Sequence, residues 1–136
     1  MSAGSLIEEG TDIHLDFSKL KQAVENSGEI IPAVAQDVET KEILMLGYVN
    51  RESLEYAQQN RVATFWSTSR NELWVKGKTS GEFLDLVETR VNCEQNSILY
   101  LVRLRSTGAC HTKEENGDFR LSCYYRKINK RKLEFC

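Results

Sequence analysis

The 136-residue sequence predicts a single, sheet-rich α+β domain with a few short helices. Six short runs have the length and composition of β-strands, whereas only two segments have the periodicity of an amphipathic helix. A chain of this length can bury a normal core without disulfides and forms one domain. We therefore expect one domain over residues 1–136, of which residues 1–14 form a flexible or loosely docked lead-in.

The composition is that of an ordinary globular protein. Apolar residues make up 40% and charged residues 28% of the chain, and the net charge of −2 is spread over mixed-sign segments. This balance argues against a nucleic-acid-binding surface. No apolar stretch reaches the length of a membrane span, and the N-terminus lacks the features of a signal peptide. We expect a cytoplasmic protein, whose reduced cysteines favour metal binding over disulfides.

The first predicted element is a short helix over residues 16–28. Asp16 can cap its N-terminus, and Gly28 is placed where a C-terminal cap belongs. Three apolar residues share one face of this helix: Phe17, Leu20 and Val24.

A β-hairpin and a second helix follow. The apolar runs at residues 30–38 and 43–49 flank a polar turn at residues 39–42, which is typical of a hairpin. Asn50 is placed to cap a helix over residues 51–60.

The second half of the chain predicts four more strands, over residues 63–67, 82–91, 97–105 and 121–128. The turn between the second and third of these contains Cys93.

Three cysteines and a histidine lie at the ends of these strands or in the loops beside them. Besides Cys93, they are Cys110 and His111, which follow the strand over residues 97–105, and Cys123, which begins or lies within the last strand. Thiolate and imidazole ligands suit Zn²⁺, and a site with three protein ligands leaves a position open for water. The spacing lacks a C-x-x-C pair, however, and free cysteines are often small core residues. From spacing alone, a zinc site and a structural role both stay open.

Four motifs occur in order along the chain: Phe65-Trp66-Ser67-Thr68-Ser69-Arg70, Trp74-Val75-Lys76-Gly77-Lys78-Thr79-Ser80-Gly81, Gly108-Ala109-Cys110-His111-Thr112 and Ser122-Cys123-Tyr124-Tyr125. Together with Cys93, this series resembles the phosphoribosyl-AMP cyclohydrolase family, whose members open the adenine ring in histidine biosynthesis. The resemblance runs from about residue 31 to about residue 126.

The resemblance implies an intertwined α+β homodimer with active sites at the subunit interface. It implies that Cys110 and Cys123 of one chain bind zinc together with Cys93 of the other chain. His111 would stand beside the metal as general base and proton shuttle, since imidazole titrates near neutral pH. A His111 that orients its loop or serves as a fourth zinc ligand is the alternative.

The family's magnesium site is altered in this sequence. Three aspartates surround the first cysteine in the family, and the matching positions here are Asn92, Glu94 and Asn96. Mg²⁺ is usually held by one or two carboxylates together with substrate phosphates and waters. Either Glu94 with substrate phosphate still holds Mg²⁺, or this cofactor site is lost.

Residues 113–120 form an insertion relative to the family. Asn116-Gly117 within it is a strong turn signal, so we expect the insertion to extend a hairpin beside the site. A solvated acidic loop is the alternative.

The implied substrate is an adenine nucleotide with a second phosphoribosyl group on N1, and water would add to C6 before the N1–C6 bond breaks. The residues expected to bind it are Lys76, Thr79, Ser80 and Gly81 in one loop, together with Ser67, Ser69 and Arg70. Trp74 either stacks on a base or belongs to the core.

Two other classes of function stay open besides this hydrolase. One is an enzyme of the same fold that acts on a different modified purine nucleotide. The other is a zinc-stabilised nucleotide-binding module without catalysis, against which the intact Cys110-His111 and Lys76-to-Gly81 motifs argue.

Overall fold

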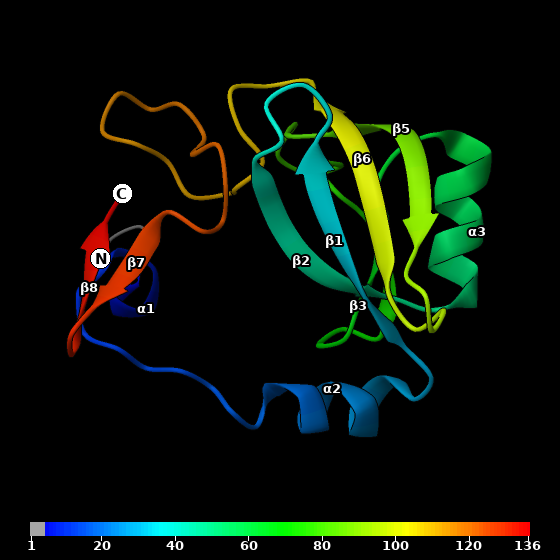
Figure 1. Ribbon diagram of the computed structural model, residues 1–136, viewed down its shortest axis with the longest axis horizontal. Coiled ribbons are helices and arrows are strands. Elements are labelled where there is room, and N and C mark those ends of the chain that lie inside the picture. Colours follow the sequence, from blue (N-terminus) through cyan, green and yellow to red (C-terminus); the bar gives the residue numbers. More distant parts are fainter. Residues whose placement is uncertain (1–4) are drawn as a thin grey trace.

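The structure is a computed structural model that describes residues 5–136. Its centre is a four-stranded mixed sheet (Figure 1). β1 pairs antiparallel with β2 and parallel with β6, and β6 pairs antiparallel with β5, which gives the order β2-β1-β6-β5. The strands are β1 (Ile31–Asp37), β2 (Ile43–Val49), β5 (Leu84–Val91) and β6 (Ile98–Leu104). The helix α3 (Arg51–Asn60) lies beside β5 in Figure 1.

The sheet buries one continuous apolar core. The side chains of Leu44, Phe65, Leu84 and Tyr100 are fully buried in it. The Tyr100 hydroxyl donates to the Thr64 carbonyl oxygen at 2.9 Å, so its one polar atom is satisfied. The five strands predicted before residue 106 and the α+β class are confirmed, each strand within two residues at either end.

The helix predicted over residues 51–60 is also confirmed, and Asn50 caps it. The Asn50 side chain accepts from the Ser53 backbone N–H at 2.9 Å, and the Ser53 hydroxyl accepts from the Asn50 N–H at 2.9 Å. Ala57 faces the core, and Arg61 ends the helix with φ of 57°.

A second, two-stranded sheet was predicted only in part. β3 (Thr64–Ser67) pairs antiparallel with β4 (Glu72–Val75), a strand that the sequence did not predict. β4 is only four residues long and shows no apolar–polar alternation, so its pattern is weak. The hairpin matters for the site because it carries most of the first two motifs.

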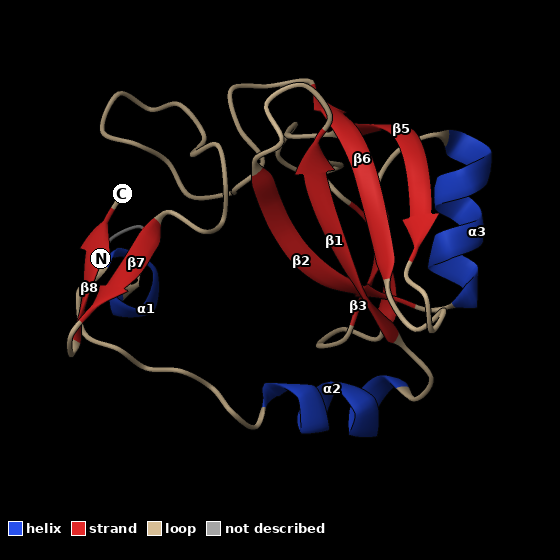
Figure 2. Cartoon of the chain, in the orientation of Figure 1, coloured by secondary structure: helices blue, strands red, loops and turns tan. Residues whose placement is uncertain are grey.

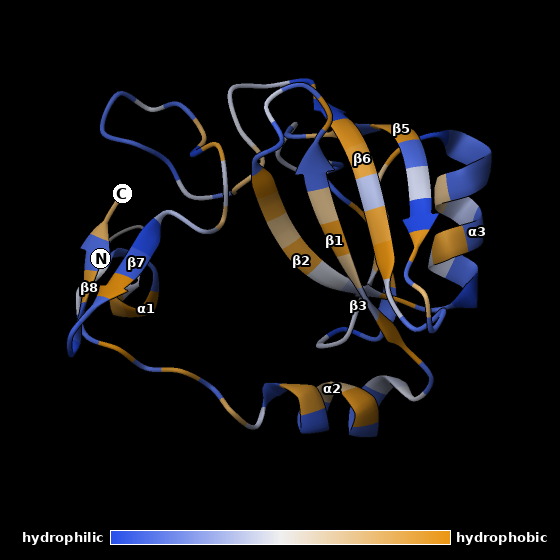
Figure 3. Cartoon of the chain, viewed as in Figure 1, coloured by the Kyte–Doolittle hydropathy of each residue, from blue (hydrophilic) through white to orange (hydrophobic). Residues whose placement is uncertain are grey.

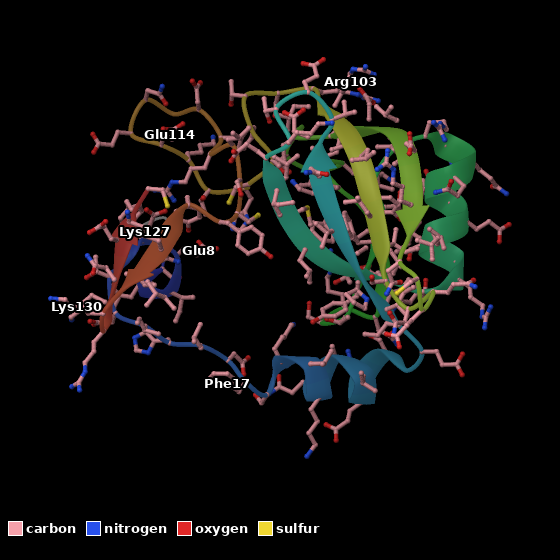
Figure 4. The ribbon with its side chains drawn as sticks, in the orientation of Figure 1. Glu8, Phe17, Arg103, Glu114, Lys127 and Lys130 are labelled. Atoms are coloured by element: carbon pink, nitrogen blue, oxygen red, sulfur yellow. The ribbon has the colours of Figure 1, made fainter. Side chains whose placement is uncertain are left out.

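The helix α2 (Lys19–Ser27) begins three residues later than predicted. Ser18 is its N-terminal cap residue, whereas Asp16 accepts hydrogen bonds from the Ser18 N–H and hydroxyl in the turn before it. Gly28 ends the helix with φ of 77°, as predicted. Figure 3 shows apolar residues on α2. The three residues that were predicted to share one face are all exposed: Phe17 (labelled in Figure 4), Leu20 and Val24.

The described ends of the chain fold against each other. α1 (Leu6–Glu9) lies against the hairpin of β7 (Arg126–Asn129) and β8 (Lys132–Phe135), and the Leu133 N–H donates to the Thr11 carbonyl oxygen at 2.8 Å. Residues 1–4 of the predicted lead-in lie outside the described residues. Its described part is held by hydrogen bonds to the C-terminal hairpin. None of the helices in residues 5–136 has the length and hydrophobicity that a membrane crossing requires.

The strand predicted over residues 121–128 is wrong in its first half. Between β6 and β7 the chain forms loops (Figure 2), and only Arg126–Asn129 is a strand. The Leu121 carbonyl oxygen accepts from the Ala109 N–H at 3.0 Å, and the Cys123 N–H donates to the Leu44 carbonyl oxygen at 2.7 Å. These bonds tie the segment to two different neighbours, so it cannot pair with one strand.

Candidate active site

A cavity of about 500 Å³ opens beside the β3–β4 hairpin and the loop that follows it. Most of the predicted site residues line it: Ser67, Ser69, Arg70, Trp74, Lys76, Thr79, Ser80, His111 and Cys123. Gly81 is exposed and is not among the lining residues. Gly77 and Ala109, which belong to the quoted motifs, also line the cavity, whereas the lining residues Met45 and Glu82 were not predicted.

The β3–β4 hairpin places the first group of these residues. Ser67 ends β3, and its hydroxyl accepts from the Arg70 N–H at 3.4 Å, which orders the turn. The Arg70 guanidinium is solvent-exposed and lies 3.4 Å from Glu72. Trp74 is half-buried against the core, with its ring 5.5 Å from that of Phe65, and it also lines the cavity. Trp74 therefore packs against the core, as one alternative expected, and stacking on a base stays a prediction.

The loop after β4 depends on a glycine. Gly77 has φ of 90°, and a Cβ at this position would lie 2.3 Å from the Phe83 backbone nitrogen. Only glycine permits this conformation and this close approach. Gly81 also has positive φ, and its N–H donates to the Gly77 carbonyl oxygen at 2.7 Å, which closes the loop.

Lys76 and Glu82 form a buried ion pair in the cavity wall. The Lys76 Nζ lies 3.2 Å from Glu82 Oε1, and each side chain is only 4% exposed. The Ser80 hydroxyl donates to the same carboxylate oxygen, whereas the buried Oε2 has no partner among the described residues. Lys76 is therefore already neutralised, and a phosphate would have to compete with Glu82 for it.

Glu82 was missed because no motif indicates it. The one indication of Glu82 in the sequence was Lys76, which directly follows the apolar residues of β4 and requires a nearby counter-charge once it is buried.

Cys110 and Cys123 form the chemical centre of the site. Cys123 lines the cavity, and the sulfur of the buried Cys110 lies 2.9 Å from the Thr112 hydroxyl oxygen. The hydrogen bond with Cys123, supported by Thr112, lowers the pKa of Cys110 to about 5. The hydrogen bond with Cys110 holds the pKa of Cys123 far above its usual range. The lowered pKa favours the thiolate form of Cys110, which is the form that binds a soft cation.

Cys93 lies at the other end of the main sheet. It sits in the turn between β5 and β6, whereas Cys110 follows the opposite end of β6. The seven residues of β6 span roughly 23 Å at about 3.3 Å per residue. Accordingly, no three His, Cys, Asp or Glu side chains within residues 5–136 are grouped to hold a metal ion. Within one chain, Cys93 cannot complete the Cys110–Cys123 pair.

The residues around Cys93 do not fit a magnesium site. The Asn92 side-chain oxygen accepts from the backbone N–H groups of Asn96 and Ser97, both at 2.9 Å. The Asn96 side-chain oxygen accepts from the Asn92 amide at 2.6 Å. Both oxygens are thus used to form the turn, and Glu94 is the single carboxylate among the three positions.

The chain's similarity to known proteins agrees with this geometry. Residues 45–125 match the phosphoribosyl-AMP cyclohydrolase family. The chain belongs to this family. A phosphoribosyl-AMP cyclohydrolase from Hyphomonas neptunium is 45% identical over 106 residues, which are 78% of this chain and 76% of the relative.

Two further phosphoribosyl-AMP cyclohydrolases are similar to the chain. The one from Desulfatibacillum aliphaticivorans is 40% identical over 89% of this chain and 86% of the relative. The one from Nitrosopumilus maritimus is 49% identical over 66% of this chain and 82% of the relative.

Every residue that lines the cavity falls inside the range matched by the cyclohydrolase family. α1 and the β7–β8 hairpin fall outside it. One contact joins the two regions at the cavity, because the His111 Nε2 lies 2.7 Å from Glu8 Oε2.

The insertion over residues 113–120 folds as a hairpin-like loop, as predicted. Lys113 and Phe119 form an antiparallel bridge, and the Gly117 N–H donates to the Glu114 carbonyl oxygen at 2.9 Å in the turn. Gly117 has φ of 91°, so the turn uses its glycine. Arg120, the last residue of the insertion, donates two hydrogen bonds to the Glu9 carboxylate, both at 2.8 Å.

Proposed function

We propose that this chain is a zinc-dependent phosphoribosyl-AMP cyclohydrolase, which hydrolyses the N1–C6 bond of the adenine ring of phosphoribosyl-AMP in histidine biosynthesis. The observation that carries this proposal is the single cavity in which His111 and Cys123 meet the β3–β4 hairpin and the loop after it. The family membership of the chain supports the same substrate.

Different residues of the cavity bind the substrate and transfer protons. The exposed Arg70 guanidinium, which is paired with Glu72 at the cavity wall, binds a substrate phosphate, with Ser67 and Ser69 donating hydrogen bonds beside it. His111 takes a proton from the attacking water as C6–O forms, and it returns a proton to N1 as the N1–C6 bond breaks. One water is consumed, and the ring opens.

Zinc fits the donor set of the site. Cys110 and Cys123 would hold it, since thiolates are preferred zinc ligands and the pKa of Cys110 is lowered. Bound zinc would supply a water molecule of lowered pKa at the cavity. The Asn92, Glu94 and Asn96 positions do not fit magnesium, so no step of this proposal uses Mg²⁺.

We further propose that Cys93 reaches the site from the partner chain of a homodimer. The length of β6 between Cys93 and Cys110 supports this arrangement. Exposed apolar residues support it as well: Phe17 is 92% exposed, and Val91, next to the Cys93 turn, is 55% exposed. Such residues are typical of a surface that another chain covers.

The decisive experiment is rescue of a histidine auxotroph that lacks its cyclohydrolase. We expect the wild-type chain and His14→Ala to restore growth and His111→Ala to fail, because His14 is an exposed residue outside the cavity. Immunoblots show whether all three proteins accumulate equally. Absence of rescue by well-expressed wild-type protein would favour another purine nucleotide as substrate or a non-catalytic module.

A mixed dimer tests the shared site. Cys93→Ser and Cys110→Ser homodimers should both be inactive, because each lacks one ligand at both sites. Refolding the two variants together should give mixed dimers about half the time, each with one intact site, and about a quarter of wild-type activity. Mixed dimers that are present by mass but inactive would refute the shared site.

A further inference from the structure

α1 and the β7–β8 hairpin form a small unit at one side of the molecule, which we call the terminal unit (Figure 1). Within this unit, side chains at the start of the β7–β8 hairpin donate hydrogen bonds to backbone carbonyl oxygens in and just after α1, and these bonds hold α1 in place. The Tyr125 hydroxyl donates to the Glu8 carbonyl oxygen at 2.6 Å. The Arg126 guanidinium donates to the carbonyl oxygen of Ile7 at 2.7 Å and to that of Gly10 at 2.8 Å. Two side chains therefore hold three carbonyl groups within the four residues from Ile7 to Gly10.

A second contact fixes the same segment from the other side. The Glu9 carboxylate accepts two hydrogen bonds from the Arg120 guanidinium, both at 2.8 Å. Arg120 lies over the Tyr125 ring, 4.1 Å from its centre, and its side chain is only 13% exposed. A two-bonded arginine stacked on an aromatic ring has a defined position.

This anchoring presents the Glu8 carboxylate to the cavity. Glu8 lies on the side of the terminal unit that faces the main sheet (Figure 4). Its Oε2 is 2.7 Å from the His111 Nε2, and no other side-chain hydrogen bond to His111 is formed within residues 5–136. Because α1 is fixed at four neighbouring points, this bond costs less conformational entropy than an ordinary exposed pair.

The bond has a definite chemical consequence. An ionised carboxylate can only accept hydrogen bonds, so Nε2 must carry the proton. In the neutral imidazole, the lone pair is then on Nδ1. A carboxylate in this position fixes both the orientation of the ring and the nitrogen that accepts a proton.

We propose that Glu8 is a positioning residue for His111, which it holds with Nε2–H donated to the carboxylate and Nδ1 directed to the reaction. The inference rests on the proposed role of His111 as general base. It assigns a function in the site to a segment outside the matched range of residues 45–125.

Steady-state kinetics of the purified full chain on phosphoribosyl-AMP test this role. We expect Glu8→Ala to lower kcat about 10–100-fold with KM changed less than about twofold, because orientation matters in the transition state. Glu8→Gln keeps an acceptor oxygen and should retain more activity than Glu8→Ala. The matched control is Glu134→Gln, an exposed carboxylate of β8 in the same terminal unit that pairs with Lys127 and not with α1 or His111, and it should stay within about twofold of wild type.

The His111→Ala background separates positioning from a general structural effect. If Glu8 acts only through His111, Glu8→Ala should change the residual rate of His111→Ala less than about twofold. An undiminished 10–100-fold loss in that background would overturn the proposal, as would a wild-type kcat in Glu8→Ala.

Imidazole ¹⁵N NMR gives a readout that does not need activity. The chain has two histidines, so spectra of His14→Gln isolate His111. Wild-type His111 should show a protonated Nε2 and a lone-pair Nδ1, and Glu8→Ala should shift both nitrogens toward averaged values. A protonated Nδ1 in the wild type would overturn the proposal. Wild-type protein that is inactive but shows the expected tautomer would refute the proposed function and leave the Glu8–His111 pair established.

Discussion

The buried Lys76–Glu82 pair allows a quantitative test of the cavity wall. Their charged atoms are 3.2 Å apart, and both side chains are 4% exposed. Coulomb's law at an effective dielectric constant of about 20 gives about 5 kcal/mol of attraction at this distance. Removing one partner leaves the other charge buried and unpaired, which costs about 3–5 kcal/mol.

We therefore expect Lys76→Met and Glu82→Gln each to lower the free energy of unfolding by about 3–5 kcal/mol, and the double variant to cost less than their sum. An exposed pair in the same chain gives the matched control. Lys127 and Glu134 are also 3.2 Å apart but 62% and 49% exposed, so their coupling should be roughly 0.2–1 kcal/mol.

Urea unfolding followed by circular dichroism measures both cycles. All variants must be compared at one protein concentration, because self-association would shift the midpoint. A buried-pair coupling no larger than that of Lys127 and Glu134 would refute the reasoning.

Three other predictions concern the metals and the loop after β4. Purified protein should carry about one zinc per chain by metal analysis, and Cys110→Ser and Cys123→Ser should lose it while the exposed Cys136→Ser keeps it; full zinc in the first two variants would exclude them as ligands. Added Mg²⁺ should leave the turnover of the unmodified chain unchanged, whereas Asn92→Asp with Asn96→Asp should make turnover respond to Mg²⁺, since an amide oxygen carries only partial charge and a carboxylate a full one; a micromolar requirement in the unmodified chain would contradict this. Gly77→Ala should destabilise the protein to urea more than Gly81→Ala, because both have positive φ but a Cβ has open space at Gly81 alone; equal losses would show that the contact with Phe83 is unimportant.

The elements that the sequence predicted well are those with a strong local signal. The helix over residues 51–60 has a capping pair, and the strands of the main sheet are apolar runs between polar turns. β4 and α1 are only four residues long, so too few residues repeat for either periodicity to be recognised. The strand predicted over residues 121–128 failed for another reason. Hydrogen bonds to Ala109 and Leu44, distant in the sequence, override the local preference for a strand.

The site residues fall into the same two groups, those with a local signal in the sequence and those without one. Residues inside motifs, such as Ser67, Lys76 and His111, were predicted, and the structure brings them to one cavity. Glu82 and Glu8 were not, because their significance depends on a partner and not on their own neighbours in sequence. Glu82 is meaningful only once Lys76 is buried beside it, and Glu8 only once α1 is anchored 103 residues away from His111.

The length of β6 connects metal binding to assembly. One chain contains the cavity and the Cys110–Cys123 pair, but its own Cys93 is separated from them by roughly 23 Å of rigid strand. A small movement of the β5–β6 turn cannot cover this distance, so we propose that the third thiol of the zinc site comes from another chain. A ligand that binds the dimer more tightly than the monomer must stabilise the dimer by the same free energy. Zinc affinity and dimer affinity are therefore coupled, and dilution of the protein should weaken zinc binding even though no ligand has been removed.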